Sequence, residues 1–322
     1  MHDRSGLSVR RQPTAPSGET LGDSPESKAE QGTIRHLLQH ASIEMTVRDA
    51  KHLQECRAQL GRPTDVFISH MPKQQWEETH QAVTAVRHAG LEPVPHLPAR
   101  AFESHAQLES VLGYFAKAQV RRALIIAGDR ATPLGPFDST LDIVRTGLLR
   151  AHGITEIYVA GHPEGHAHMS ADQLRANERE KVEAAERAGL AATFVTQFSF
   201  DSACFIEWIK QLRTSGIHAP VVIGLAAPAR LTTLIKFGTV CGIGASLRFL
   251  TTRAGNIAQL ATERGPEPMI RALARAHNRG VIVIAGLHFF AFGGFKRTCA
   301  WMGSHAREVT HADDALHVAT RG

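Results

Sequence analysis

A histidine-rich segment near the middle of the chain combines several groups that could do chemistry. The residues from Gly161 to His168 read Gly-His-Pro-Glu-Gly-His-Ala-His, which places three imidazoles and one carboxylate in eight positions. Such groups can bind divalent metals, and neutral imidazoles also make hydrogen bonds that hold a loop in shape. An apolar run, residues 157–160, precedes them, and Pro163 cannot donate a ladder hydrogen bond. We therefore expect a buried strand that ends in a polar loop.

Other polar residues also stand directly after apolar runs. In a parallel α/β protein the carboxyl ends of the strands meet at one edge, which is where such proteins bind ligands. One polar residue at a strand end is usually ordinary loop chemistry, but a set from several strands indicates a site. The set comprises Glu44, Ser69, His70, His96, Asp129, His162, Glu164, His166, Gln197 and His288.

Eight apolar runs, separated by amphipathic segments of helical character, must position these residues. Their spacing of roughly 25 to 40 residues indicates a parallel sheet, and eight strands are the number that closes a (β/α)8 TIM barrel. An open doubly wound sheet is the alternative, but no strand is followed by a glycine-rich nucleotide loop. The runs are residues 42–45, 65–70, 92–97, 121–127, 157–160, 192–200, 220–225 and 281–290.

The chain is predicted to fold as one catalytic barrel domain, residues 33–305, between two tails. Residues 1–32 offer little apolar surface to offset the entropy of ordering them, so we expect a disordered N-terminal tail. Residues 306–322 are assigned to a C-terminal tail. Extra short helices are expected over residues 242–264, between strands seven and eight, and a helix over residues 268–277 precedes the eighth strand.

The composition of the chain excludes several kinds of binding partner. The net charge of +5 is spread among 31 acidic residues, and only 6% of residues are aromatic, so nucleic-acid binding is not expected. No apolar run is long enough to span a membrane, and the N-terminus lacks the apolar core of a signal peptide. The four cysteines lie far apart, as in a reduced cytoplasmic protein. Whether the chain forms a homo-oligomer stays open.

Two other kinds of active site are disfavoured. A barrel hydrolase would place His-x-His at the end of its first strand, where this chain has Glu44-Met45, so we expect no metal at the histidine-rich segment. A serine or cysteine nucleophile is also not expected, because there is no Gly-x-Ser-x-Gly motif and no cysteine at a predicted strand end.

Five short motifs stand in order at successive predicted strand ends. They are Ser42-Ile43-Glu44, Pro95-His96-Leu97, Gly128-Asp129, Gly161-His162-Pro163-Glu164-Gly165-His166, and Thr196-Gln197-Phe198 with Asp201. Lys181 falls in the helix that follows the fourth motif. Together they resemble the methylenetetrahydrofolate reductase family, over about residues 34–303.

The resemblance implies a flavoprotein oxidoreductase that carries FAD on a (β/α)8 barrel. NADH or NADPH would reduce the FAD, and the flavin would then pass a hydride to 5,10-methylenetetrahydrofolate to give 5-methyltetrahydrofolate, in one-carbon metabolism and methionine biosynthesis. Glu44 matches the general acid that protonates N10 of the folate, Asp129 the residue that holds the pterin and tunes the flavin, and Gln197 a pterin contact. The expected FAD-binding set is His96, Gly128, Asp129, His162, Glu164, His166 and Lys181.

The chemistry of the chain fits the role implied for Glu44. Its neighbours Ile43 and Met45 are apolar, and we expect their desolvation of the carboxyl to hold it protonated. Where the family often has tyrosine and arginine, however, this chain has His162 and Ala127. Two alternatives therefore stay open: oxidation of 5-methyltetrahydrofolate in one-carbon catabolism, and a folate-binding barrel without turnover.

Overall fold

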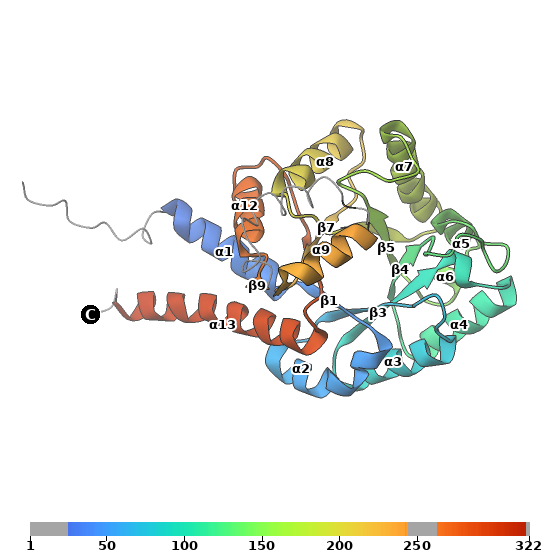
Figure 1. The fold of residues 1–322 in the computed structure, drawn as a ribbon, viewed down its shortest axis with the longest axis horizontal. Coiled ribbons are helices and arrows are strands. Elements are labelled where there is room, and N and C mark those ends of the chain that lie inside the picture. Colours follow the sequence, from blue (N-terminus) through green and yellow to red (C-terminus); the bar gives the residue numbers. More distant parts are fainter. Residues whose placement is uncertain (1–24, 242, 244–262, 320–322) are drawn as a thin grey trace, which may run out of the picture.

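The computed structural model describes residues 25–241, 243 and 263–319. Its centre is a closed barrel of eight parallel strands in the spatial order β1, β10, β7, β6, β5, β4, β3, β2, as expected for a (β/α)8 TIM barrel (Figure 1). The barrel strands are β1 (Ser42–Met45), β2 (Asp65–Ile68), β3 (Glu92–Pro98), β4 (Arg122–Ile126), β5 (Glu156–Gly161), β6 (Ala191–Thr196), β7 (Val221–Ala226) and β10 (Gly286–Phe290).

Helices pack around the barrel, most of them on its outside (Figure 1). They are α1 (Pro25–Gln39), α2 (Leu53–Leu60), α3 (Trp76–His88), α4 (His105–Lys117), α5 (Thr140–Arg145), α6 (Leu148–Ala151), α7 (Ala171–Arg187), α8 (Ser202–Thr214), α9 (Leu231–Val240), α12 (Glu267–Asn278) and α13 (Phe295–Ala319), with 3₁₀ turns η1 (Val47–His52) and η2 (Ala99–Ala101). The short helices α5 and α6 do not join into one helix, because Gly147 between them adopts a φ of 74°.

The strands are buried on both faces, and the two faces have different partners. One set of side chains, including Ile43 and Met45 of β1, joins the large apolar cluster with the helices. The alternate residues point into the barrel, where five of them form a separate buried layer: Phe67, Val94, Leu124, Tyr158 and Val195. Because successive side chains of a strand point to opposite faces, the inward side chains of neighbouring strands lie together inside the barrel, above and below this layer.

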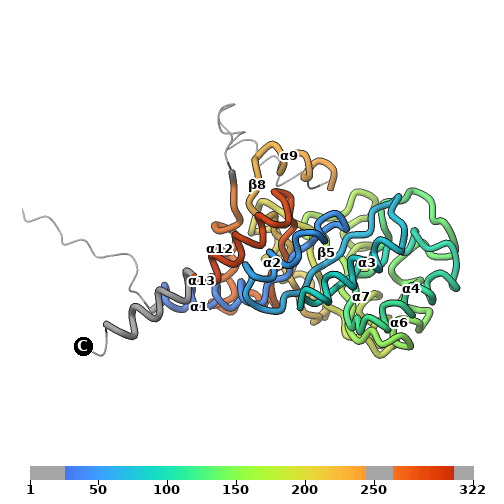
Figure 2. The backbone as a smooth tube through the Cα atoms, turned by 90° about the horizontal axis from the view of Figure 1, so that it is seen from below, coloured from blue at the N-terminus to red at the C-terminus, as the bar shows by residue number. Residues whose placement is uncertain are grey.

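The connection between β7 and β10 carries the additional elements predicted between strands seven and eight. After β7, the two-residue strand β8 (Ala229–Arg230) pairs antiparallel with β9 (Glu263–Arg264), and α9 lies over one end of the barrel (Figure 2). The expected short helices over 242–264 fall mostly outside the described residues. The eighth strand begins at Gly286 rather than at residue 281, and of the five residues before it Ala285 donates a backbone hydrogen bond to Val221.

Helices α1 and α13 lie side by side and extend away from the barrel (Figures 1 and 2). Both include residues that the sequence analysis assigned to tails. Residues 25–32 belong to α1, which buries Leu37 and Leu38. It forms ion pairs from Glu30 to Arg275 of α12 and from Glu26 to Arg279, the residue directly after α12. Residues 306–319 continue α13 rather than forming a tail. Residues 1–24 lie outside the described part of the chain.

Candidate active site

The carboxylate of Glu44 lies inside the barrel near the carboxyl end of β1, held by side chains of the two neighbouring strands. The Ser69 hydroxyl, directly after β2, donates a hydrogen bond of 2.5 Å to Glu44 Oε1. On the other side, His288 Nε2 of β10 is 3.4 Å from Glu44 Oε2. The parallel pairing of β1 with both β2 and β10 brings these three side chains together.

The environment of Glu44 favours the ionised carboxylate. Burial raises its pKa, but the hydrogen bond with His288, the charges of His96 and His288, and the Ser69 hydroxyl together lower that pKa to about 2. The expectation that Ile43 and Met45 keep the carboxyl protonated is therefore wrong. Both side chains pack outward against the helices, whereas Glu44 points inward among imidazoles.

His96 of β3 completes this inner cluster. Its ring is 7% exposed and meets Phe67 edge-on, with ring centroids 6.1 Å apart. Burial lowers the pKa of His96, and the charge of Glu44 partly opposes that shift. Among the described residues, no group hydrogen-bonds to His96 Nε2, although the atom is buried. A buried ring nitrogen without a partner is free to hydrogen-bond a ligand or an ordered water.

A second cluster lies after β5, where the histidine-rich segment begins. His162 is half-buried, its Nδ1 has no hydrogen-bond partner in the described part of the chain, and its ring meets that of His166 at a centroid distance of 5.1 Å. Burial, followed by the charges of Lys181 and His166, lowers the pKa of His162 to about 3. His162 is therefore a neutral imidazole at physiological pH, while His166 and His168 lie exposed.

Helix α7 supplies the buried cation of this second cluster. Lys181 is 8% exposed, and burial lowers its pKa while Glu178, one turn earlier, opposes the shift. Glu178 is itself fixed by Arg175 at 2.7 Å and by the indole N–H of Trp208 at 2.9 Å. The Trp208 ring packs over β5 so closely that a Cβ on Gly161 would lie 2.6 Å from it. The loop after β5 thus rests on a fixed support.

The remaining predicted residues lie around the mouth of the barrel. Gly128 follows β4 with a φ of 93°, and a Cβ there would lie 2.8 Å from that of Pro98. Asp129 beside it is exposed, and Gln197 is half-buried directly after β6. Cys241, at the end of α9, has its pKa raised by burial and by the charges of Asp129 and Glu44. The charges of both carboxylates thus act on the thiol that follows α9.

Sequence reasoning left some members of the inner cluster without a role. It placed Ser69 and His288 at strand ends but did not connect them to Glu44, and it did not consider Ser42 or Cys241 for the site. The only signal was barrel closure, which makes the first and last strands neighbours. No group of three or more histidine, cysteine, aspartate or glutamate side chains in the described residues is arranged to hold a metal ion.

Comparison with known proteins identifies the family. Residues 51–298 match the sequence profile of methylenetetrahydrofolate reductase. The chain belongs to the methylenetetrahydrofolate reductase family. Asp129, His162, Lys181 and Gln197 lie within the matched segment, whereas Glu44 precedes it. The assignment of Glu44 therefore depends on its motif and on the geometry of the barrel.

Two curated bacterial relatives carry the same family name. The 5,10-methylenetetrahydrofolate reductase of Pectobacterium carotovorum subsp. carotovorum is 28% identical over 171 residues, 52% of this chain and 54% of the relative. That of Buchnera aphidicola subsp. Baizongia pistaciae is 27% identical over 159 residues, 49% of this chain and 51% of the relative. The matches span about half the length of these relatives.

A solved structure shares the fold. It is an uncharacterised protein from Clostridium thermocellum that binds two copies of 5-methyl-5,6,7,8-tetrahydrofolic acid, with a TM-score of 0.56 over 84% of this chain and 95% of that chain. Its sequence identity is 11%, so the similarity supports the barrel fold alone. Separately, none of the helices in the described residues is both long and apolar enough to cross a membrane.

Proposed function

We propose that this protein is a flavin-dependent oxidoreductase that uses NAD(P)H to reduce 5,10-methylenetetrahydrofolate to 5-methyltetrahydrofolate. The observation that carries the proposal is the Glu44 carboxylate, held between Ser69 and His288 inside a family barrel. Opening the one-carbon bridge of the folate requires a proton at N10. An inward carboxylate beside an imidazole is placed to pass a proton to a folate bound at the mouth of the barrel, once the carboxylate has been protonated.

The residues around the mouth of the barrel fit FAD. His96 Nε2 and His162 Nδ1 are buried without partners in the described chain, and both suit a ligand rich in hydrogen-bonding groups. Lys181 adds a buried cation suited to a pyrophosphate. Bound there, FAD supplies hydride transfer between NAD(P)H and the folate. His96, Gly128, Asp129, His162, Glu164, His166 and Lys181 form the proposed FAD site.

The other polar residues of the rim are assigned to the folate. In the proposed site the exposed Asp129 holds the amino groups of the pterin and contributes a negative charge near the flavin, and Gln197 makes a further hydrogen bond to the pterin. Helix α9 lies over one end of the barrel (Figure 2), and burial, with the charges of Asp129 and Glu44, raises the pKa of Cys241 directly after it. Substrate would therefore bind between α9 and the inner cluster.

One observation favours the reverse reaction as a second candidate. The pKa of Glu44 is lowered to about 2, so the carboxylate is ionised and ready to accept a proton at neutral pH. Oxidation of 5-methyltetrahydrofolate in one-carbon catabolism would use Glu44 as that base. Stopped-flow measurement of flavin reduction by 5-methyltetrahydrofolate, against flavin oxidation by 5,10-methylenetetrahydrofolate, distinguishes the two directions.

The visible absorbance spectrum of the purified protein tests the proposal. We expect a yellow protein with flavin absorbance, or one that acquires it on reconstitution with FAD, and bleaching of that absorbance by NADH or NADPH without oxygen. A colourless protein that rejects FAD contradicts the proposal. Folate binding by such a protein would favour a binding barrel without turnover.

The proposal also covers the cellular location of the protein and its oligomeric state. A cytoplasmic enzyme is proposed because the four cysteines are free in the structure and the expected substrates are soluble. A role in methionine biosynthesis follows if reduction is the working direction. A homo-oligomer stays a prediction, which the molecular mass in solution tests.

A further inference from the structure

Two cysteine thiols meet where the last barrel helix packs against the first. Cys56 lies in α2, which follows β1, and Cys299 lies in α13, which follows β10. The start of α13 lies next to α2 (Figure 1). Both cysteines are 0% exposed, and their two thiols are hydrogen-bonded to each other. The pair therefore joins the beginning and the end of the barrel, whose strands β1 and β10 close it.

The backbones of α2 and α13 approach each other closely at this point. Gly303 of α13, one turn after Cys299, makes the approach possible, because a Cβ there would lie 2.2 Å from the carbonyl oxygen of Gln59. Gln59 is itself one turn after Cys56 in α2. Small residues at a contact let helices pack at the short end of the usual interaxial range of roughly 8–10 Å. A disulfide needs such an approach, because its Cα atoms lie roughly 4.4–6.8 Å apart.

Polar contacts on both sides of the thiols fix the register of the two helices. Before the thiols, Lys296 Nζ lies 2.9 Å from Glu55 Oε1. After them, Arg307 donates a hydrogen bond of 3.1 Å to the carbonyl oxygen of Gln59. Lys296 and Arg307 stand at helical spacings from the cysteine and the glycine of α13, so all four share one face. The two sulfur atoms are thus held opposite each other by contacts along the whole face.

We propose that Cys56 and Cys299 are a redox modification site, at which a peroxide converts the two thiols into a disulfide that ties α13 to α2. In the first step the thiolate of one cysteine attacks hydrogen peroxide. The O–O bond breaks, an S–O bond forms, and the hydroxide released takes up the thiol proton to give water. The second thiol then attacks the first sulfur, so that the S–S bond forms, the S–O bond breaks and a second water leaves.

The balance of this reaction needs no further reactant. The two thiols together lose two protons and two electrons, and one hydrogen peroxide is reduced to two waters. Burial makes the rate depend on movement of α13. The hydrogen bond with Cys56, then burial, then the charges of Cys56 and Asp49 raise the pKa of Cys299, which keeps it a thiol while the helices are packed. Because the thiolate is the reactive form, we expect oxidation to follow local opening of α13.

Peptide mapping of the oxidised protein tests the pairing. The full chain is treated with hydrogen peroxide, its remaining thiols are blocked in denaturant, and it is digested with trypsin without a reductant. We expect residues 52–57 and 298–307 to appear as one linked peptide, lighter by about 2 Da than the two thiol peptides together. Cys56→Ser and Cys299→Ser should each abolish it. Blocked thiols, or sulfinic and sulfonic acids, at both positions in the wild type would overturn the proposal.

Thermal unfolding tests whether the disulfide fits the folded helices. We expect the Tm of the oxidised wild type to exceed that of the dithiothreitol-reduced wild type by roughly 5 °C, and Cys56→Ser to show no such rise. Cys204→Ser is the matched control, because Cys204 bonds to Ser199 and to the carbonyl of Asp201 instead, and it should behave as the wild type. An equal or lower Tm after oxidation contradicts the proposal. If Cys56→Ser does not fold, the two forms of the wild type still decide the question.

The rate of oxidation tests the requirement for movement of α13. Lys296→Ala removes the ion pair to Glu55 and should speed disulfide formation by about twofold to fivefold, as expected for one exposed ion pair. Lys210→Ala, at an exposed position of α8, should leave the rate unchanged. The same rate in all three proteins would show that the thiols react without opening of α13. None of these measurements involves folate or flavin, so their outcome is independent of the proposed function.

Discussion

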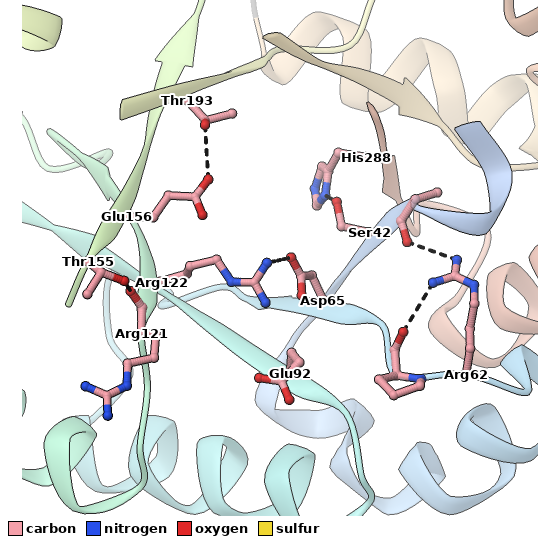
Figure 3. Close-up of polar contacts among 12 residues, drawn as sticks. Ser42, Arg62, Asp65, Glu92, Arg121, Arg122, Thr155, Glu156, Thr193 and His288 are labelled. Atoms are coloured by element: carbon pink, nitrogen blue, oxygen red, sulfur yellow. Dashed lines mark hydrogen bonds and ion pairs between the residues drawn. The ribbon is translucent and has the colours of Figure 1, made fainter. Parts of the chain in front are cut away.

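The two ends of the barrel interior are both polar, but they satisfy their polar groups differently. At the amino end, Arg122 bonds to Asp65 at 2.5 Å and Thr193 bonds to Glu156 at 3.0 Å, as Figure 3 shows. At the carboxyl end, His96 and His162 each bury a ring nitrogen to which no described group hydrogen-bonds. Polar groups that satisfy one another stabilise a fold, whereas unpartnered ones mark the place of a ligand.

The largest expected difference concerns one carboxylate at each end. Glu44→Gln should slow folate reduction by about 10²–10⁴-fold, because it removes the group that delivers the proton, while hydride transfer from NAD(P)H to the flavin is unchanged. The matched change at the amino end, Glu156→Gln, should leave both half-reactions intact. Separate stopped-flow measurement of the two half-reactions checks this. Equal losses in both half-reactions of Glu44→Gln would make Glu44 structural.

The ion pair at the amino end should matter for stability rather than for catalysis. Asp65→Asn leaves Arg122 without its charged partner in a half-buried position, and we expect the free energy of unfolding to fall by about 1–3 kcal/mol. Urea denaturation followed by circular dichroism measures the loss. The KM for folate should stay the same. A changed KM for folate together with an unchanged free energy of unfolding would contradict this expectation, because it would place the ligand at the amino end of the barrel.

Asp129 tests whether an exposed carboxylate at the mouth belongs to the site. Asp129→Asn should weaken folate binding about tenfold, as expected for a hydrogen bond to a charged group, and should shift the flavin reduction potential. Equilibrium titration of the oxidised protein with folate and a redox titration check the two effects. Asp138→Asn, at an exposed position in the same connection, serves as the control. Unchanged binding and potential would remove Asp129 from the site.

The smallest expected effect is on acid stability. Burial lowers the pKa of His162 to about 3 in the folded protein, below its ordinary value of 6.5, so the unfolded chain binds more protons between those values. Stability is therefore lost as the pH falls below about 6.5. His162→Gln should reduce the drop in Tm between pH 7 and pH 5, and His168→Gln, at an exposed position, should not. Identical drops in all three proteins would contradict the burial of a neutral His162.

The sequence predicts the barrel well because strand signals are local. Each strand is a short apolar run with polar residues at its end, and the barrel that these runs predict was confirmed. Helix α1 was missed because its sequence is polar. It is held by distant contacts, such as the ion pair between Glu30 and Arg275. A local composition rule carries no information about such contacts.

In the candidate site, too, the local features could be predicted from the sequence and the distant contacts could not. Glu44, Asp129 and Gln197 could be named because each follows or ends a strand within a short motif. The contact between Ser42 and His288 could not, because those residues are 246 positions apart and meet only when the barrel closes. The alternation of side chains along a strand could have predicted the direction of Glu44. It places Ile43 and Met45 together on one face of β1, the outer face, and Glu44 on the opposite, inner face.

Anaerobic mixing of the flavin-reduced protein with 5,10-methylenetetrahydrofolate tests the central claim most directly. The account predicts that flavin absorbance returns in a single turnover, that 5-methyltetrahydrofolate forms in equal amount, and that Glu44→Gln slows the return while leaving the preceding reduction by NAD(P)H unchanged. A flavin that stays reduced although the folate is bound would contradict it.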